Sequence, residues 1–209
     1  MLASVLLALP IHAAQLTLEL ANGTRTWDTE QLLTHPEARE IDIPDDVSYK
    51  RAMHYRAVPV AALLEGVSSE AHLQAVATDG FAAEIPAAPL LQKTGAQAWL
   101  AIEDPAHPWP GLSKEKPGAG PFYLVWTDPA ASKISPEQWP YAVGTIPLLA
   151  SVAERFPALL PDPKLPADDP GNNGLALFPN NWCACPRSNG AGDSPLGRDL
   201  PRSLHPTPT

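Results

Sequence analysis

Apolar and polar residues alternate along several short stretches of the chain, which is the pattern of half-buried β-strands. The first, residues 16–20, reads LTLEL, and the dipeptide Asn22-Gly23 that follows is typical of a tight hairpin turn. The stretch at residues 121–126, PFYLVW, is apolar throughout, so we expect a central strand there. Strands are predicted at residues 16–20, 73–78, 81–85, 99–102, 121–126 and 139–146.

Short helices are predicted between some of these strands. Asp28 is a suitable N-cap for a helix that runs to His35. The apolar stretch at residues 57–65 indicates a second helix, and Pro86 is placed to open a third. The pattern over residues 15–150 therefore predicts one β-rich domain of the α+β class.

Proline is unusually frequent, with 26 of 209 residues, about 12%, against an average of about 5%. Because proline inside a helix removes a hydrogen bond and clashes with the preceding turn, no long helix is expected where it is dense. From Phe156 to Pro179 a proline occurs at nearly every fourth position. This composition predicts a semi-rigid, extended linker over residues 151–179.

The first 14 residues are predicted to be a secretory signal peptide. Residues 1–14 form an apolar stretch that ends in small residues, and the alternating pattern begins directly after Gln15. No basic residue precedes the apolar stretch, so a buried first strand or helix stays open as the alternative. A signal peptide predicts an exported, periplasmic protein.

The charge of the chain excludes one broad class of partner. Fourteen basic and 23 acidic residues give a net charge of −9, and such a chain repels the phosphates of nucleic acids. No apolar run reaches the roughly 18 residues of a membrane span, so none is expected in the mature chain.

Three stretches within residues 50–147 together resemble a known module: AVPVAALLEGV, LQAVATDGF, and AWLAIEDPAHPWP followed by GPFYLVW. They are similar to the molybdopterin-binding-like domain of the sulfite oxidase superfamily. The resemblance implies a mixed, barrel-like sheet with short helices. Catalytic members bind molybdenum through a cysteine thiolate, and residues 1–182 contain no cysteine. We therefore expect neither bound molybdopterin nor enzymatic activity. A molybdenum enzyme that lacks the thiolate stays open as an alternative.

The segment at residues 180–209 resembles the beginning of a c-type cytochrome domain, which bacterial relatives of the module carry at their C-terminus. Residues 189–193 read NGAGD, an element that follows the haem-binding C-x-x-C-H pattern in that family. The spacing aligns Cys185 with the second haem cysteine. Trp182 then stands in place of the first cysteine, and Pro186 in place of the histidine.

These departures predict that haem c, expected in intact relatives, is absent here. Trp182 has no thiol, and Pro186 has no lone pair to offer iron. Cys183 lies two positions from Cys185 and lacks the C-x-x-C spacing, so free thiols and a single thioether link through Cys185 both stay open. The sequence ends about 24 residues after Cys185, which we interpret as a truncated cytochrome segment.

Three residues are candidates for contacts with a ligand. His54 and Arg56 lie close in sequence and could meet an anion such as the phosphate of a pterin. His107 lies in the proline-rich loop at residues 104–120, where a ligand could dock. Exposed surface positions are the alternative for each. Three tryptophans are candidates to line a pocket or to pack in the core: Trp109, Trp126 and Trp139.

Two functions follow from these features. The first is a periplasmic electron-transfer protein by ancestry, whose haem would exchange electrons with a periplasmic redox partner. The second is a non-catalytic periplasmic binding module, in which residues 15–150 hold a small anionic ligand or a protein partner.

Overall fold

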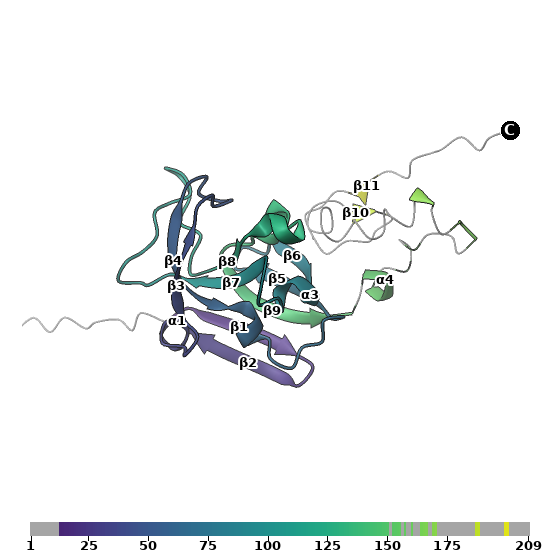
Figure 1. Cartoon of the computed structure of the whole chain (residues 1–209), viewed down its shortest axis with the longest axis horizontal. Helices are drawn as coiled ribbons and strands as arrows, with labels where there is room; N and C mark the ends of the chain where they lie inside the picture. Colours follow the sequence, from purple (N-terminus) through teal and green to yellow (C-terminus); the bar gives the residue numbers. More distant parts are fainter. Residues whose placement is uncertain are drawn as a thin grey trace, which may run out of the picture.

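Two β-sheets make up the body of the structure (Figure 1). This computed structural model describes residues 13–150, 152–155, 157, 160, 164–166, 169–170, 187–188 and 199–200. The larger sheet contains, in spatial order, β2 (Gly23–Asp28), β1 (Gln15–Leu20), β9 (Val143–Leu149), β5 (His72–Ala77) and β6 (Ala82–Pro86). The smaller sheet contains β3 (Arg39–Ile43), β4 (Met53–Pro59), β7 (Gln97–Ile102) and β8 (Phe122–Thr127).

The larger sheet is mixed, as predicted, but neither sheet closes into a barrel. β1 pairs in parallel with β9 and antiparallel with β2, and β5 pairs antiparallel with both β6 and β9. β2 and β6 end the larger sheet, and β3 and β8 end the smaller one. The polar sequence of β2, GTRTWD, suits an open, solvent-facing edge. The barrel-like arrangement expected from the resemblance is therefore wrong, whereas the β-rich α+β class is confirmed.

The alternation in β1 corresponds to its two faces. Leu16 and Leu18 have no exposed surface, and Leu20 is also buried. Glu19, which lies between Leu18 and Leu20, faces solvent. The β1–β2 hairpin turns at Ala21 and Asn22, one position before the predicted dipeptide, so that Gly23 is the first residue of β2. In the β5–β6 hairpin, Gly80 has a φ of +90°, a conformation that favours glycine.

β8 is buried like a central strand but lies at the edge of its sheet. Residues Phe122 to Trp126 are all buried. The chain after it covers the free edge, because the Leu124 N–H donates to the Pro140 carbonyl at 3.0 Å and the Trp126 indole N–H to the Gln138 carbonyl at 2.7 Å. Residues 139–142 were predicted as strand, but they form this cover, and β9 begins only at Val143.

The helices are short. α1 (Thr29–Leu33) begins where predicted, and Asp28 forms a capping box with Gln31. The helix predicted at residues 57–65 is only α2 (Val60–Leu63), because residues 57–59 belong to β4 and pair with β7. The remaining helical elements are α3 (Ala87–Leu90), α4 (Val152–Arg155), and the 3-10 turns η1 (Pro129–Ser132) and η2 (Pro136–Gln138).

A buried charge cluster fixes the chain after β9 to the larger sheet. Glu84 of β6 is only 3% exposed, and its carboxylate accepts from His72 Nδ1 at 3.0 Å. Its second oxygen pairs with the Arg155 guanidinium, whose Nε also donates to the Ala150 carbonyl. Arg155 thus neutralises a carboxylate that would be costly to bury alone.

Several predictions fall outside the described residues. These are the signal peptide up to residue 12, most of the linker, and the haem-segment residues Trp182, Cys183, Cys185 and Pro186. Beyond them, β10 (Arg187–Ser188) and β11 (Asp199–Leu200) pair in parallel. No helix within the described part of the chain is long and apolar enough to cross a membrane.

Candidate functional site

A buried carboxylate, Asp46, organises the loop between β3 and β4. Its side chain has no exposed surface. Oδ1 accepts from the backbone N–H groups of Ser48 at 2.9 Å and Tyr49 at 2.8 Å. The Tyr55 hydroxyl donates to Oδ2 at 2.8 Å, and the Tyr123 hydroxyl donates to Oδ1 at 3.2 Å. These four partners are neutral hydrogen-bond donors, and they compensate for the burial of the charge.

The two phenols beside Asp46 resist ionisation. Burial raises the pKa of Tyr55 far above its usual value of about 10, and the negative charge of Asp46 raises it further. Burial also raises the pKa of Tyr123, whose hydroxyl oxygen lies 3.0 Å from Ser48 Oγ as well. Both tyrosines are therefore harder to ionise than a free tyrosine, and at neutral pH they are donors to the carboxylate.

The loop between β7 and β8 packs against this cluster. The Ala119 N–H donates to the Tyr49 hydroxyl at 2.9 Å, and the Trp109 N–H donates to Glu103 Oε1 at 2.7 Å. A Cβ at Gly120 would lie 2.0 Å from Glu103 Oε2, so the Glu103 side chain occupies space that only glycine leaves free. The loop is thus held at both ends by side-chain contacts.

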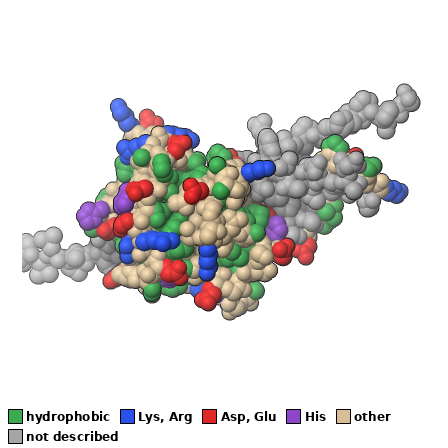
Figure 2. All heavy atoms as spheres, in the orientation of Figure 1, with side chains coloured by type: hydrophobic (Ala, Val, Ile, Leu, Met, Phe, Trp, Pro, Cys, Tyr) green, Lys and Arg blue, Asp and Glu red, His purple; other side chains and the backbone are tan. Residues whose placement is uncertain are grey.

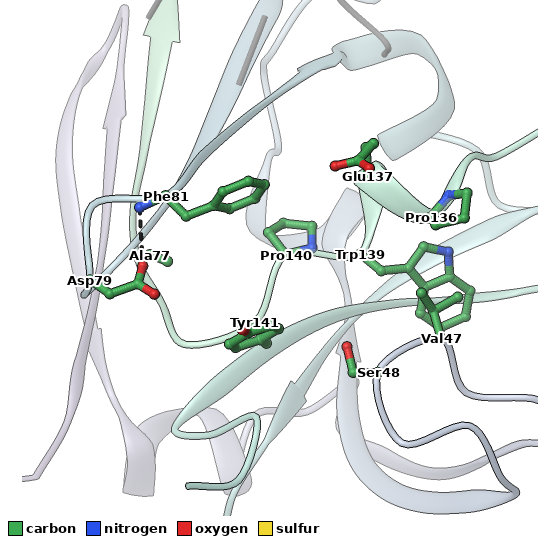
Figure 3. Close-up of a pocket in the computed structure, with 10 residues that line it drawn as sticks. All are labelled: Val47, Ser48, Ala77, Asp79, Phe81, Pro136, Glu137, Trp139, Pro140 and Tyr141. Atoms are coloured by element: carbon green, nitrogen blue, oxygen red, sulfur yellow. Dashed lines mark hydrogen bonds between the residues drawn. The ribbon is translucent and has the colours of Figure 1, made fainter. Parts of the chain in front are cut away.

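A pocket of about 240 Å³ opens beside this cluster, between the β5–β6 turn and the chain that precedes β9. Figure 3 shows Phe81 and Tyr141 on one side of the pocket, Trp139 on the other, and the Glu137 carboxylate above the space between Phe81 and Trp139. Ser48 connects the pocket wall to the Asp46 cluster through Tyr123. The lining residues are Val47, Ser48, Ala77, Asp79, Phe81, Pro136, Glu137, Trp139, Pro140 and Tyr141.

A second pocket, of about 540 Å³, adjoins the first and shares three of its residues: Val47, Pro136 and Trp139. Its other lining residues are Asp42, Ile43, Pro44, Asp45, Trp126, Thr127, Asp128, Pro129 and Ile134. Trp139 is 4% exposed and stands between the two spaces. The two are called the Trp139 pockets below.

The Trp139 pockets carry negative charge. Asp79 and Glu137 line the first pocket, and Asp42, Asp45 and Asp128 line the second. No lysine, arginine or histidine is among the described lining residues of either pocket. Elsewhere, on the face shown in Figure 2, acidic and basic side chains are interspersed. The charged lining residues of the pockets are therefore all acidic, and one of them, Asp42, is contacted by His54 from outside the lining.

His54 and Arg56, the candidates for anion contacts, lie on β4 opposite acidic residues of β3. His54 contacts Asp42 Oδ1 at 2.8 Å and Glu40 Oε2 at 3.1 Å, and the hydrogen bond to Asp42 raises the His54 pKa. Arg56 lies 3.8 Å from Glu40 Oε1 and donates to the Leu33 carbonyl. Both basic side chains therefore already have acidic partners in this chain.

His107 lies apart from them, in the loop between β7 and β8. Its ring is 85% exposed and contacts Asp104 Oδ2 at 3.0 Å. The structure thus places His54 and Arg56 side by side and His107 on a different element. It does not include any of the three among the lining residues of the Trp139 pockets.

The tryptophans divide between pocket and packing. Trp139 lines both pockets and Trp126 lines the larger one. Trp109 packs edge-on against Tyr55, with ring centroids 4.9 Å apart. The sequence predictions did not include Asp46, Tyr55 or Tyr123, although the adjacent pair Asp45-Asp46 is visible in the sequence.

Comparisons with known proteins leave the family open. No protein-family model matches this chain, and no curated protein matches it. Among solved structures, the crystal structure of the sulfane dehydrogenase SoxCD from Paracoccus pantotrophus matches with a TM-score of 0.43 and 18% identity. The match covers 68% of this chain and 40% of that chain, so this chain spans less than half the length of that protein. This is a distant likeness of fold alone.

Asp46→Asn is expected to lower the free energy of unfolding by about 1–3 kcal/mol, because the amide group turns a donor toward phenols and N–H groups that need an acceptor. The measurement is urea unfolding of the full chain at neutral pH. Asp45→Asn is the matched control: its neighbouring side chain is exposed, and we expect a change within about 0.5 kcal/mol. Equal losses in the two variants would contradict the role of Asp46.

The raised pKa values of Tyr55 and Tyr123 predict a loss of stability at high pH. Above about pH 10 a tyrosine of the unfolded chain ionises while these two stay protonated, so each lowers stability by about 1.4 kcal/mol per pH unit. Below about pH 10 the tyrosine is protonated in both the folded and the unfolded chain, so no stability is lost there. Tyr55→Phe should therefore show a shallower decline than the unaltered chain when unfolding is measured from pH 9 to 11. The same slope in both chains would be inconsistent with a raised pKa at Tyr55.

Proposed function

We propose that residues 13–150 form a binding module whose recognition site is the Trp139 pockets, and that its ligand is a small organic cation such as a protonated amine or a guanidinium. One observation carries the proposal: aromatic rings and carboxylates line the pockets without any basic side chain among the described lining residues. A cation gains from both, through attraction to the faces of aromatic rings and through Coulomb attraction to carboxylates.

The volume and the lining of the first pocket support a small ligand. Its volume of about 240 Å³ lies below the roughly 300–1,000 Å³ of pockets for drug-sized molecules. Phe81, Trp139 and Tyr141 supply ring surfaces, and Asp79 and Glu137 supply the charges. The Asp79 carboxylate accepts from the Phe81 N–H at 3.0 Å, which fixes the position of this acid at the rim.

The charge of these pockets favours a cation over the anionic ligand expected from the sequence. An anion would meet the carboxylates of Asp45, Asp79, Asp128 and Glu137, besides that of Asp42, which His54 already contacts. The basic residues His54 and Arg56, which suggested the anion, already have acidic partners on β3. A binding module thus stays the proposal, with the sign of its ligand reversed.

n-Butylguanidinium is the probe that tests this function. We expect it to raise the melting temperature of the full chain and to bind in calorimetry, with affinity that falls as salt increases. Butanoate and n-butanol, which have similar apolar parts, should not reproduce the effect. Equal stabilisation by all three compounds would contradict recognition of the positive charge.

Glu137→Gln should weaken the binding of n-butylguanidinium about fivefold, which corresponds to about 1 kcal/mol for one carboxylate near the cation. Calorimetry on the full chain measures the change. Glu115→Gln, an exposed position in the loop between β7 and β8, is the control and should leave the affinity unchanged. The same loss in both variants would indicate a general charge effect instead of a site.

For residues 180–209 we propose descent from a c-type cytochrome, in an exported protein whose intact relatives exchange electrons with a periplasmic partner. The NGAGD element and the position of Cys185 support it. When the unaltered chain is exported together with the haem-attachment machinery, we expect no covalent haem. The double variant Trp182→Cys, Pro186→His restores the C-x-x-C-H pattern and should acquire it. Haem on the unaltered chain would refute the loss of the site.

A further inference from the structure

A further pocket, of about 200 Å³, opens beside the first residue of β3 and shares no lining residue with the Trp139 pockets. Two basic side chains from separate segments line it: Arg39 of β3, and Lys93 from the segment between α3 and β7. We propose that this pocket, called the Arg39 pocket below, binds a small oxyanion of charge −2, such as the phosphate group of a phosphorylated small molecule.

An aromatic ring holds Arg39 in position. The guanidinium carbon of Arg39 lies over the ring of Trp99, 4.4 Å from its centroid. Trp99 is itself fixed, because it is only 3% exposed and its indole N–H donates to Thr127 Oγ1 at 3.1 Å. A guanidinium over a ring face keeps the N–H groups of its edge available, and two of these match two oxygens of a phosphate. Arg39 is therefore placed to receive an oxyanion before one binds.

The two basic side chains of the Arg39 pocket have no acidic partner in the part of the chain that the structure describes. No ion pair there includes Arg39 or Lys93, whereas Arg56 on the neighbouring strand β4 lies close to Glu40. Gln97, the first residue of β7, adds an amide that can donate to a further oxygen of the anion. The Arg39 pocket thus offers donors and positive charge that this chain's described carboxylates do not already use.

The charge balance of the Arg39 pocket favours a dianion. Glu37 is the one acid among the described lining residues, so the lining has two positive charges and one negative charge. This sign is opposite to the net charge of −9 of the whole chain. Because Coulomb attraction is proportional to the charge of the anion, a dianion gains twice as much as a single carboxylate such as acetate or butanoate.

Binding at the Arg39 pocket does not depend on the cation site. The two sites have no lining residue in common and attract ligands of opposite charge. Lys93→Gln should therefore leave the binding of n-butylguanidinium unchanged, so that the two proposals can fail separately.

Inorganic phosphate is the probe that tests the Arg39 pocket. In calorimetry on the full chain at pH 8 and constant ionic strength, we expect phosphate to bind at one site and acetate to show no measurable binding. Lys93→Gln should weaken the binding of phosphate about fivefold, because one positive charge is lost beside the anion. Glu37→Gln should strengthen it about fivefold, because the one acid of the lining is lost.

Lys114→Gln is the matched control for Lys93→Gln, because Lys114 is exposed in the loop between β7 and β8 and makes the same change in net charge. It should leave the affinity for phosphate unchanged. Lys93, Glu37 and Lys114 are all exposed, so these variants are expected to fold. Absence of phosphate binding would overturn the proposal, and so would equal losses in Lys93→Gln and Lys114→Gln. Weaker or unchanged binding in Glu37→Gln would also contradict it.

Discussion

The burial of the Asp46 carboxylate is the constraint on which the candidate site depends. A charge without exposed surface requires hydrogen-bond donors, and those it finds come from its own loop, from β4 and from β8. The requirement therefore fixes the loop between β3 and β4 against two strands of the smaller sheet. Ser48 and Val47, which follow directly in that loop, become part of the pocket wall.

The pockets arise where this fixed loop meets the segment that covers the edge of β8. The hydrogen bonds from Leu124 and Trp126 hold residues 138–140 in place, and they set Trp139 between the two spaces. Carboxylates from three separate segments converge there, and no basic residue is among the described lining residues. The first segment contributes Asp42 and Asp45, the second Asp79, and the third Asp128 and Glu137. Trp139 thus lines both pockets.

The sequence predicts the elements whose pattern is set locally. β1, β5, β6 and β7 follow from alternation or apolar runs, and the capping box at Asp28 marks α1. The prediction fails where pairing across the sheet prevails. Residues 57–59 look helical by composition, but they extend because they bond to β7. The exposed charges of β3 hide its two buried isoleucines, Ile41 and Ile43.

The site itself could not be predicted in the same way. Asp45 and Asp46 look equivalent in the sequence, and only the fold makes one exposed and the other buried. The partners that distinguish Asp46 are Tyr55, 9 positions away, and Tyr123, 77 positions away. His54 and Arg56 looked unpaired in the sequence and therefore suggested an anionic ligand. Their carboxylate partners on β3 become neighbours only when the two strands pair in the sheet.

A crystal structure of the full chain with bound n-butylguanidinium tests the central claim most directly. The account predicts the guanidinium in a Trp139 pocket, against the ring of Trp139 and within hydrogen-bond distance of a lining carboxylate. A guanidinium bound elsewhere, with both pockets empty at a saturating concentration, would contradict it.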